Sequence, residues 1–284
     1  MSFILNCAKV VLSFELKKSK KVFFKSKIIE FKKFSIFAMW TCQLDKHFFI
    51  YLCHIYEDYL KHKEMKVINM SERDSVLNQF LAELRDVNIQ QDRMRFRRNM
   101  ERIGELQAYE ISKTLTYSEK SIQTPLGVAK VNIPDENIVI GTVFRAGLPQ
   151  HQGFLNVLDR AGNAFASAYR CYKDKECRQM DVHIEYIASP DLTGCTFMLV
   201  DPMLATGESL ELAWNAFLSK GKPAKLHIAC VIASPQGVEH LNKVFSDVSN
   251  VTLWCAVIDQ ALNERSYILP GLGDAGDLSF GGKI

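Results

Sequence analysis

Short apolar runs alternate with amphipathic segments along most of the chain. Several runs are almost wholly apolar, which is typical of strands covered on both faces of a parallel sheet. These runs occupy 138–144, 195–200, 225–233 and 251–258. Helical spacing of apolar positions follows most of them, over 149–162, 210–218 and 235–245. The alternation predicts a doubly wound α/β domain with a mainly parallel sheet, whose ligands bind at the carboxyl ends of the strands.

The segments before and between these runs complete the predicted fold. Ser71-x-x-Asp74 resembles a capping box that opens an amphipathic helix. A longer helix is predicted over 90–113, and the five Arg in its first half are expected to form a solvated or interface face. Alternation over 128–133 predicts a further strand.

One hairpin is predicted in the middle of the chain. A strand over 164–169 ends at Arg170, and 181–187 alternates as its partner. The charged residues 171–180 between them lack apolar periodicity, so we expect a mobile loop.

Composition divides the chain at residue 64. Residues 1–64 contain 12 Lys, six acidic residues and no Arg, Gly or Pro, and carry a formal charge of +6 against +3 for the whole chain. The remaining part, 65–284, is expected to be the folded domain. The extension is interpreted as an upstream segment included by an early start codon, with Met65 or Met70 the true start, or as a peripheral basic appendage.

Neither a membrane span nor a dedicated metal site is predicted. The longest charge-free run of the extension, 34–44, is shorter than the roughly 18 residues that a spanning helix needs. The eight Cys show no C-x-x-C spacing, and Cys195, Cys230 and Cys255 lie in apolar runs. His residues are scattered, without a zinc-site pattern. We therefore expect a reduced, cytoplasmic protein.

The segment from Asp201 to Ser209 has the composition of an anion site. It joins an apolar run to a predicted helix, where unpaired N–H groups and the helix dipole favour a phosphate. Hydroxyls of Thr206 and Ser209 add donors, and Asp201 can accept hydrogen bonds from sugar hydroxyls. Phosphate and ribose sites in one loop indicate a phosphorylated sugar.

Two other predicted strand ends place arginines at the same edge of the sheet as Asp201. Arg145 follows the run 138–144, and Arg170 ends the strand over 164–169. His151 and Gln152 are interpreted as part of a helix start rather than as catalytic residues.

Near the C-terminus, Gly271-Leu-Gly-Asp-Ala-Gly276 matches G-x-G-x-x-G. A dinucleotide fingerprint opens a helix inside a βαβ unit, with an acid about 20 residues further on, and this segment has no room for that arrangement. The glycines instead predict a tight loop that exposes its main chain to a ligand, with Asp259 and Glu264 before it as structural anchors.

Three motifs together resemble the uracil phosphoribosyltransferase family. They are Arg145-Ala-Gly-Leu148, Val200-Asp-Pro-Met-Leu-Ala-Thr-Gly-Glu-Ser209 and Tyr267-Ile-Leu-Pro-Gly-Leu-Gly-Asp-Ala-Gly-Asp277. The resemblance covers roughly residues 65–284. It implies a type I phosphoribosyltransferase fold with a β-hairpin arm and a C-terminal base-binding loop. The implied reaction transfers ribose 5-phosphate from 5-phosphoribosyl 1-diphosphate (PRPP) to uracil, giving UMP and diphosphate in pyrimidine salvage.

The resemblance also implies site residues. Arg145 and Asp201 are the implied catalytic residues. PRPP binding is implied for Arg145, Arg170, Asp201, Pro202, Met203, Leu204, Ala205, Thr206, Gly207, Glu208, Ser209 and Asp274. Uracil binding is implied for Ile268, Gly273, Asp274 and Ala275. Glu208 departs from the family's usual Thr-Gly-Gly-Ser loop, and we expect its side chain to point outward.

The implied cofactor is Mg²⁺ carried with PRPP, and no protein metal ligands are expected. The implied partners are uracil and PRPP, a second copy of the chain in a dimer or tetramer, and a nucleotide effector such as GTP. Three rivals stay open, namely an enzyme of the same fold for another base, an RNA-binding regulator of pyrimidine genes, and a catalytically silent homologue. The formal charge of −3 over 65–284 disfavours RNA, which demands a basic surface. Neither nucleic acid nor membrane is expected as a partner.

Overall fold

The computed structural model describes residues 65–172 and 180–282, with the side chains of 168–184 left out. The described residues belong to one compact unit, Lys63–Ile284. The extension predicted over 1–64 lies outside the described residues, so the fold below is that of this unit.

A mainly parallel sheet forms the centre of this unit. Neighbouring strands are parallel except β5 and β6, which form the predicted hairpin. In sheet order the strands are β1 (Lys66–Asn69), β10 (Val251–Ile258), β9 (Lys225–Ala233), β7 (Thr196–Val200), β4 (Ile138–Phe144), β5 (Gly162–Tyr172) and β6 (Met180–Ala188), while β8 (Met203–Leu204) also pairs with β9. The buried runs of the sequence are the central strands, which confirms the predicted α/β fold.

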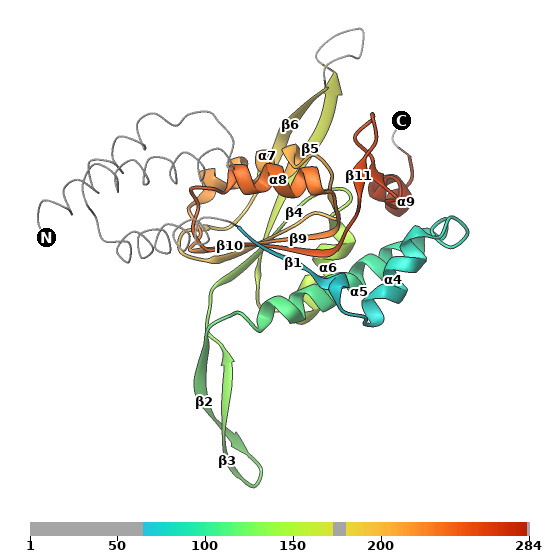
Figure 1. Ribbon diagram of the computed structural model, residues 1–284. Coiled ribbons are helices and arrows are strands. Elements are labelled where there is room, and N and C mark those ends of the chain that lie inside the picture. Colours follow the sequence, from blue (N-terminus) through green and yellow to red (C-terminus); the bar gives the residue numbers. More distant parts are fainter. Residues whose placement is uncertain (1–64, 173–179, 283–284) are drawn as a thin grey trace, which may run out of the picture. The chain divides into compact units, whose positions relative to one another are not determined.

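Helices cover both faces of the sheet (Figure 1). On one face lie α7 (Glu208–Phe217) and α8 (Pro235–Val244), whose apolar side chains join those of the strands in one core cluster. The other face carries α4 (Val76–Arg85), α5 (Arg93–Ser112) and α6 (Leu148–Val157), which form two further clusters. The domain is therefore doubly wound, as the alternation of strands and helices predicts.

The predicted capping box is wrong. Ser71 lies in a short 3₁₀ turn, Met70–Glu72, and the cap of α4 is Ser75, whose hydroxyl accepts a hydrogen bond from the N–H of Leu77 at 3.3 Å. The reason is β1, a strand that the sequence pattern does not reveal. Because β1 pairs with β10, the chain leaves the sheet first and enters the helix one turn later than predicted.

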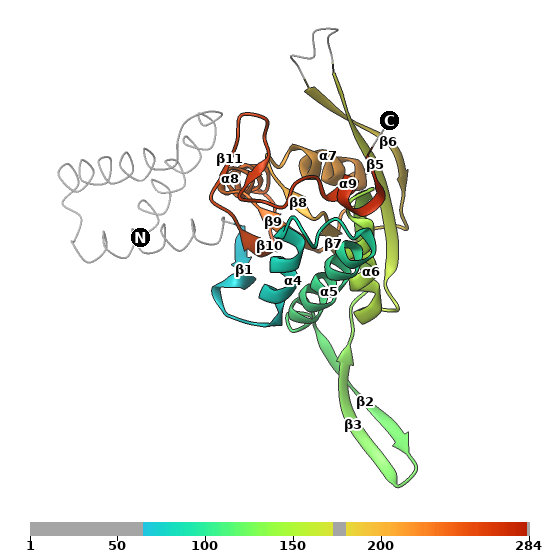
Figure 2. The same cartoon turned by 90° about the vertical axis from the view of Figure 1, so that its right-hand side faces the viewer.

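An antiparallel hairpin of β2 (Tyr117–Thr124) and β3 (Gly127–Pro134) projects from the body of the unit in both views (Figures 1 and 2). The second strand contains the alternating residues 128–133. Several apolar side chains on this arm are exposed, namely Tyr117, Ile122, Leu126, Val128 and Val131. The hairpin matches the arm that the resemblance implies.

The β5–β6 hairpin is longer than predicted. Strand β5 continues past Arg170 to Tyr172, and β6 begins at Met180. Residues 173–179, within the predicted mobile loop, lie outside the described residues. No helix in the described ranges is long and apolar enough to cross a membrane.

Candidate functional site

The candidate site lies where β4 and β7 end side by side. The two strands are parallel neighbours, with Thr142 opposite Val200, and the chain leaves them toward opposite faces of the sheet. Arg145 follows β4 directly, and Asp201 follows β7. Such a switch point opens a crevice at the carboxyl edge of a doubly wound sheet. The structure therefore brings these two predicted site residues to one edge.

Asp201 is held in place by hydrogen bonds to main-chain groups of neighbouring residues. Its N–H donates to the carbonyl of Ala229 at 3.1 Å, and its Oδ1 accepts from the N–H of Met203 at 3.4 Å. The carbonyl of Pro202 accepts from Val231 and Ile232 on β9. The turn after β7 is thus tied to the neighbouring strand, and the nearly buried Asp201 is held at the edge of the sheet.

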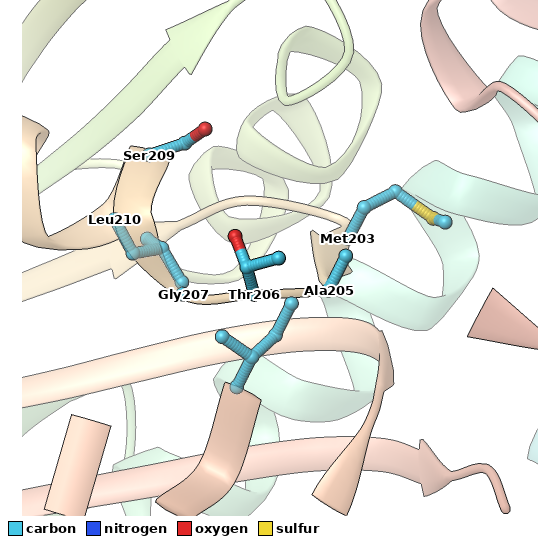
Figure 3. Close-up of a pocket in the computed structure, with 7 residues that line it drawn as sticks. Met203, Ala205, Thr206, Gly207, Ser209 and Leu210 are labelled. Atoms are coloured by element: carbon cyan, nitrogen blue, oxygen red, sulfur yellow. The ribbon is translucent and has the colours of Figure 1, made fainter. Parts of the chain in front are cut away.

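The loop after Asp201 forms a small pocket at the start of α7. It is lined by Met203–Gly207, Ser209 and Leu210, and Figure 3 shows the hydroxyls of Thr206 and Ser209 on the same side of the loop. Gly207 has a φ of 90°, a left-handed conformation that favours glycine. No described side chain caps the first turn of α7. Its N–H groups therefore suit an anion.

The back of this loop is held by Ser234, between β9 and α8. The Ser234 N–H donates to the carbonyl of Leu204 at 2.9 Å, and its hydroxyl donates to the carbonyl of Ala205 at 2.6 Å. Both carbonyls are thereby bonded to a residue that does not line the pocket. This arrangement keeps two electronegative oxygens hydrogen-bonded beside the candidate anion site. The sequence did not predict it because Ser234 lies 25 or more residues from the loop.

The terminal loop lies between β12 (Ile268–Leu269) and α9 (Ala275–Phe280). Ile268 and Ala275 are buried, and Gly273 has a φ of 95°. Asp274 caps α9, because its Oδ1 accepts from the N–H of Asp277 at 2.9 Å. The glycine-rich segment is a loop followed by a six-residue helix, outside any βαβ unit, so the predicted absence of a dinucleotide fingerprint agrees with its setting.

Arg145 connects the end of β4, beside Asp201, to the region of the terminal loop. Its Nη2 donates to Asp277 Oδ1 at 3.1 Å and to the carbonyl of Gly281 at 3.1 Å. A Cβ built on Gly276 would lie 3.8 Å from that of Ala146, so the loop after β4 packs against α9. The arginine predicted for the PRPP side thus reaches the helix that follows the predicted base-binding loop.

Two arginines that sequence reasoning missed also hold the C-terminal region. Arg85, the last residue of α4, forms an ion pair with Asp259 at 2.6 Å and donates to the carbonyl of Gly271 at 3.2 Å. Arg97 donates to the carbonyl of Ser279 at 2.7 Å. The Arg cluster on α5 therefore is not only a solvated face. Asp259 anchors the loop as predicted, because its Oδ2 accepts from the N–H of Gly271 at 2.8 Å.

Some predicted residues are not brought into the pocket. Glu208 is exposed and does not line it, in agreement with the expected outward side chain. Arg170 lies inside β5, and its side chain is outside the described part. His151 is buried in α6 against Phe165, and burial lowers its pKa, which fits a structural role. Among the described residues no group of three or more His, Cys, Asp or Glu could hold a metal ion.

Comparisons with known proteins agree with one another. The family model for uracil phosphoribosyltransferase matches residues 71–282. A uracil phosphoribosyltransferase from Porphyromonas gingivalis is 54% identical over 220 residues, which cover 78% of this chain and 100% of that protein. One from Thermococcus gammatolerans is 34% identical over 216 residues, covering 75% of this chain and 92% of that protein.

A solved structure extends this likeness to the fold. The AQ2163 protein from Aquifex aeolicus superimposes with a TM-score of 0.67 at 28% identity, covering 77% of this chain and 99% of that one. The residues matched by the family model, 71–282, include the loop after β7, the loop after β4 and the terminal loop. The chain therefore belongs to the uracil phosphoribosyltransferase family.

Proposed function

We propose that this chain transfers ribose 5-phosphate from PRPP to N1 of uracil, giving UMP and diphosphate in pyrimidine salvage. The observation that carries the proposal is the junction at Arg145. This residue follows the strand beside Asp201 and also contacts Asp277, directly after the glycine-rich loop. The loop proposed to bind the sugar phosphate and the loop proposed to bind the base therefore lie at one edge of the sheet.

In the proposed PRPP half, the start of α7 holds the 5-phosphate. The N–H groups of the first turn and the hydroxyls of Thr206 and Ser209 supply donors. Asp201 accepts hydrogen bonds from the ribose hydroxyls. Arg145 and Arg170 meet the diphosphate, because a guanidinium offers paired donors to phosphate oxygens.

In the proposed base half, uracil is read by the main chain between Ile268 and Ala275. Uracil presents O4 as an acceptor and N3–H as a donor, while cytosine reverses both. A fixed N–H and C=O therefore accept uracil and leave two groups unpaired with cytosine. At about 1–3 kcal/mol for each unsatisfied buried group, this gives roughly 30-fold to 25,000-fold discrimination.

The proposed chemistry needs little covalent help from the protein. Uracil N1 bonds to the anomeric carbon as the bond from that carbon to diphosphate breaks, through a transition state with oxocarbenium character, and the N1 proton passes to water or to the departing diphosphate. The residues of the chain hold the ribose and the base in line, and Arg145 stabilises the charge that grows on the leaving group. Positioning and electrostatics then account for catalysis.

We propose that Mg²⁺ arrives as part of the PRPP substrate. The turn after β7 offers a single carboxylate, Asp201, followed by Pro202, which suits contact with ribose hydroxyls rather than a full set of metal ligands. Bound to the diphosphate, the ion neutralises charge on the leaving group.

The β2–β3 arm supports a homo-oligomer, a dimer or a tetramer. A two-stranded hairpin is marginally stable alone, and Leu126 at its tip is 100% exposed. A second copy of the chain would cover such an arm, and sedimentation of the chain with Leu126→Asp against the unaltered chain tests this. A nucleotide effector such as GTP rests on the family resemblance, and a GTP titration of the assay tests it.

We propose further that residues 65–284 form the catalytic domain and that the protein works in the cytoplasm. Cys195, Cys230 and Cys255 are free and buried in strands or beside them, and burial raises the pKa of Cys255 to about 12. Unreactive, reduced thiols of this kind suit a reducing compartment.

The deciding experiment is UMP formation by the full-length chain from uracil and PRPP, with Mg²⁺ present. We expect turnover with uracil and far less with cytosine, orotate or a purine base. Preference for another base would overturn the uracil assignment, and RNA binding without turnover would favour the regulator. The same assay on a chain starting at Met65 tests the proposed domain limits, and equal rates are expected.

A further inference from the structure

We propose that Arg85 and Asp259 are positioning residues for the base half of the site, a role that rests on the proposed function. They clamp Gly271, which lies between the predicted uracil contacts Ile268 and Gly273. Neither touches uracil in this proposal. They act by fixing the main chain that reads the base.

The clamp holds both polar groups of one residue. Asp259 Oδ2 accepts from the N–H of Gly271 at 2.8 Å, and Arg85 Nη1 donates to the carbonyl of Gly271 at 3.2 Å. The same Nη1 also donates to Asp259 Oδ2 at 3.0 Å, while Nη2 donates to Oδ1 at 2.6 Å. The two side chains therefore act as one bidentate unit with a fixed geometry.

The clamp is attached to rigid elements. Asp259 directly follows β10, and its N–H donates to the carbonyl of Ala233 at 2.8 Å, at the end of β9. Arg85 ends α4, whose Leu77, Leu81 and Leu84 are buried. The loop itself lies outside strand and helix over 270–273, so its position depends on such contacts.

Contacts of Gln90 also link the end of α4 to the terminal loop. Gln90, after α4, donates to the carbonyl of Arg85 at 3.1 Å, and its Oε1 lies 4.0 Å from the place a Cβ on Gly273 would take. The end of α4 thus holds the loop through Arg85, and Gln90 lies close to Gly273. The contacts of Arg85 with Asp259 and Gly271 join residues more than 170 positions apart, which explains why no local motif reveals them.

Burial makes this ion pair sensitive to substitution. The side chain of Asp259 is only 5% exposed and that of Arg85 is 24% exposed. Removing the arginine leaves a largely desolvated carboxylate with fewer donors, and the loop then shifts to regain them. A displacement of this kind changes where the loop N–H and C=O meet the base, while the PRPP loop keeps its own anchors.

The test is steady-state kinetics of the full-length Arg85→Gln and Asp259→Asn variants. We expect the KM for uracil to rise by roughly tenfold to a hundredfold, as a misplaced binding group typically costs. The KM for PRPP should change by less than about threefold. Arg85→Lys, which keeps the charge but not the fork, should recover part of the loss.

The matched control is Arg95→Gln. Arg95 also forms a bidentate pair, with Glu83 at 2.8 Å, but does not contact the loop, so both KM values should stay near those of the unaltered chain. Equal rises in both KM values for the Arg85 and Asp259 variants, or loss of thermal stability alone, would overturn the proposal. If Asp259→Asn fails to fold, Arg85→Lys carries the same test. Absence of UMP formation by the unaltered chain would instead reject the proposed function.

Discussion

The two halves of the site are built in different ways. The phosphate-binding part of the proposed PRPP half is one continuous segment, from Asp201 to Leu210, placed by the end of β7 and the start of α7. The base half is a loop held by residues from α4, from the end of β10 and from the turn after β4. One is local in sequence, and the other is assembled from the whole domain.

This difference determines how substitutions should act. A change in the PRPP half alters the groups that meet the phosphate, so its effect should appear first in the KM for PRPP. Substitutions at residues that do not contact the base can also displace the proposed base-binding loop, because residues 270–273 belong to no strand or helix. Comparing the two KM values for each variant therefore tests whether the halves are independent.

The largest effect is expected for Gly271→Ala. Gly271 has a φ of 64°, and a Cβ there would collide with the main-chain carbonyl of Ile268, which cannot rotate away as a side chain could. Strain and overpacking of this kind cost several kcal/mol, so kcat/KM for uracil should fall by at least about a hundredfold. Kinetics with uracil varied at saturating PRPP would measure it.

Gly194→Ala is the matched control for this change. Gly194 has a similar φ of 72° but nothing lies within 4 Å of an added Cβ, so it introduces the same backbone strain without the collision. Its effect on uracil kinetics should be small. A Gly271→Ala enzyme with normal kinetics would show that the loop does not need its observed path.

The next largest effect is a pH dependence of the free energy of unfolding, which concerns the sheet beneath both halves of the proposed site. His227 lies on β9, whose far end pairs with β8 and accepts the N–H of Asp259. Burial lowers the pKa of His227 from 6.5 to about 4, Glu136 and Lys225 contribute in opposite directions, and Trp254 donates to its Nδ1 at 3.2 Å. The folded state therefore holds a neutral imidazole whose Nδ1 is already an acceptor.

The sign of the effect follows from the lowered pKa. Above pH 6.5 the ring is neutral in both states, and the stability is fully present. As the pH falls from 6.5 toward 4, His227 becomes protonated in the unfolded chain but stays neutral in the folded chain. The free energy of unfolding therefore decreases over this range. By pH 4 the loss should reach about 3 kcal/mol. Urea unfolding at pH 7 and pH 4 measures it, and His227→Gln should remove the part of the dependence that comes from this ring.

A smaller effect is expected for Gly207→Ala in the PRPP half. Its φ of 90° disfavours alanine by about 1–2 kcal/mol, and the new Cβ would lie 2.8 Å from Cδ2 of His240. That ring is a side chain and can move, unlike the carbonyl beside Gly271. The KM for PRPP should rise roughly tenfold while the KM for uracil stays nearly constant.

Adding His240→Ala separates the two causes of this effect. The second substitution removes the close contact but leaves the backbone strain, so only part of the loss should return. Equal rises in both KM values would mean that the PRPP loop and the base loop move together, and the contrast between the halves would then be wrong.

The same contrast shows what could be predicted from the sequence. Buried strands such as 225–233 and 251–258 were predicted with the bounds they have, because their apolar runs record burial directly. The segment from Asp201 to Ser209 joins β7 to α7 as predicted, since its signal is local, but Met203–Leu204 form the short strand β8 and α7 begins at Glu208, two residues before the predicted start. The cap of α4 was misplaced because β1, a half-buried strand of four residues, carries almost no pattern of its own.

The anchors of the base half could not be predicted in this way. An arginine at the end of a helix, such as Arg85, is usually a surface residue, and only the fold shows that Asp259 and Gly271 lie beside it. Ser234 behind the PRPP loop is a similar case. Contacts between distant segments depend on how whole helices and strands pack. No local spacing of residues in a single sequence therefore predicts them.

The smallest effect is expected at Glu208, which departs from the Thr-Gly-Gly-Ser loop that the family resemblance implies. The side chain is exposed at the first position of α7 and does not line the pocket, so water screens its charge from a bound phosphate. Glu208→Gly should therefore leave the KM for PRPP within about twofold. It should lower the free energy of unfolding by about 1 kcal/mol, since an acid at a helix start is favourable and glycine in a helix is not. Glu208→Gln removes the charge alone and should lose less stability. A KM for PRPP that drops several-fold in both variants would show that the carboxylate turns toward the phosphate, and the pocket would then include the side chain that this structure leaves outside it.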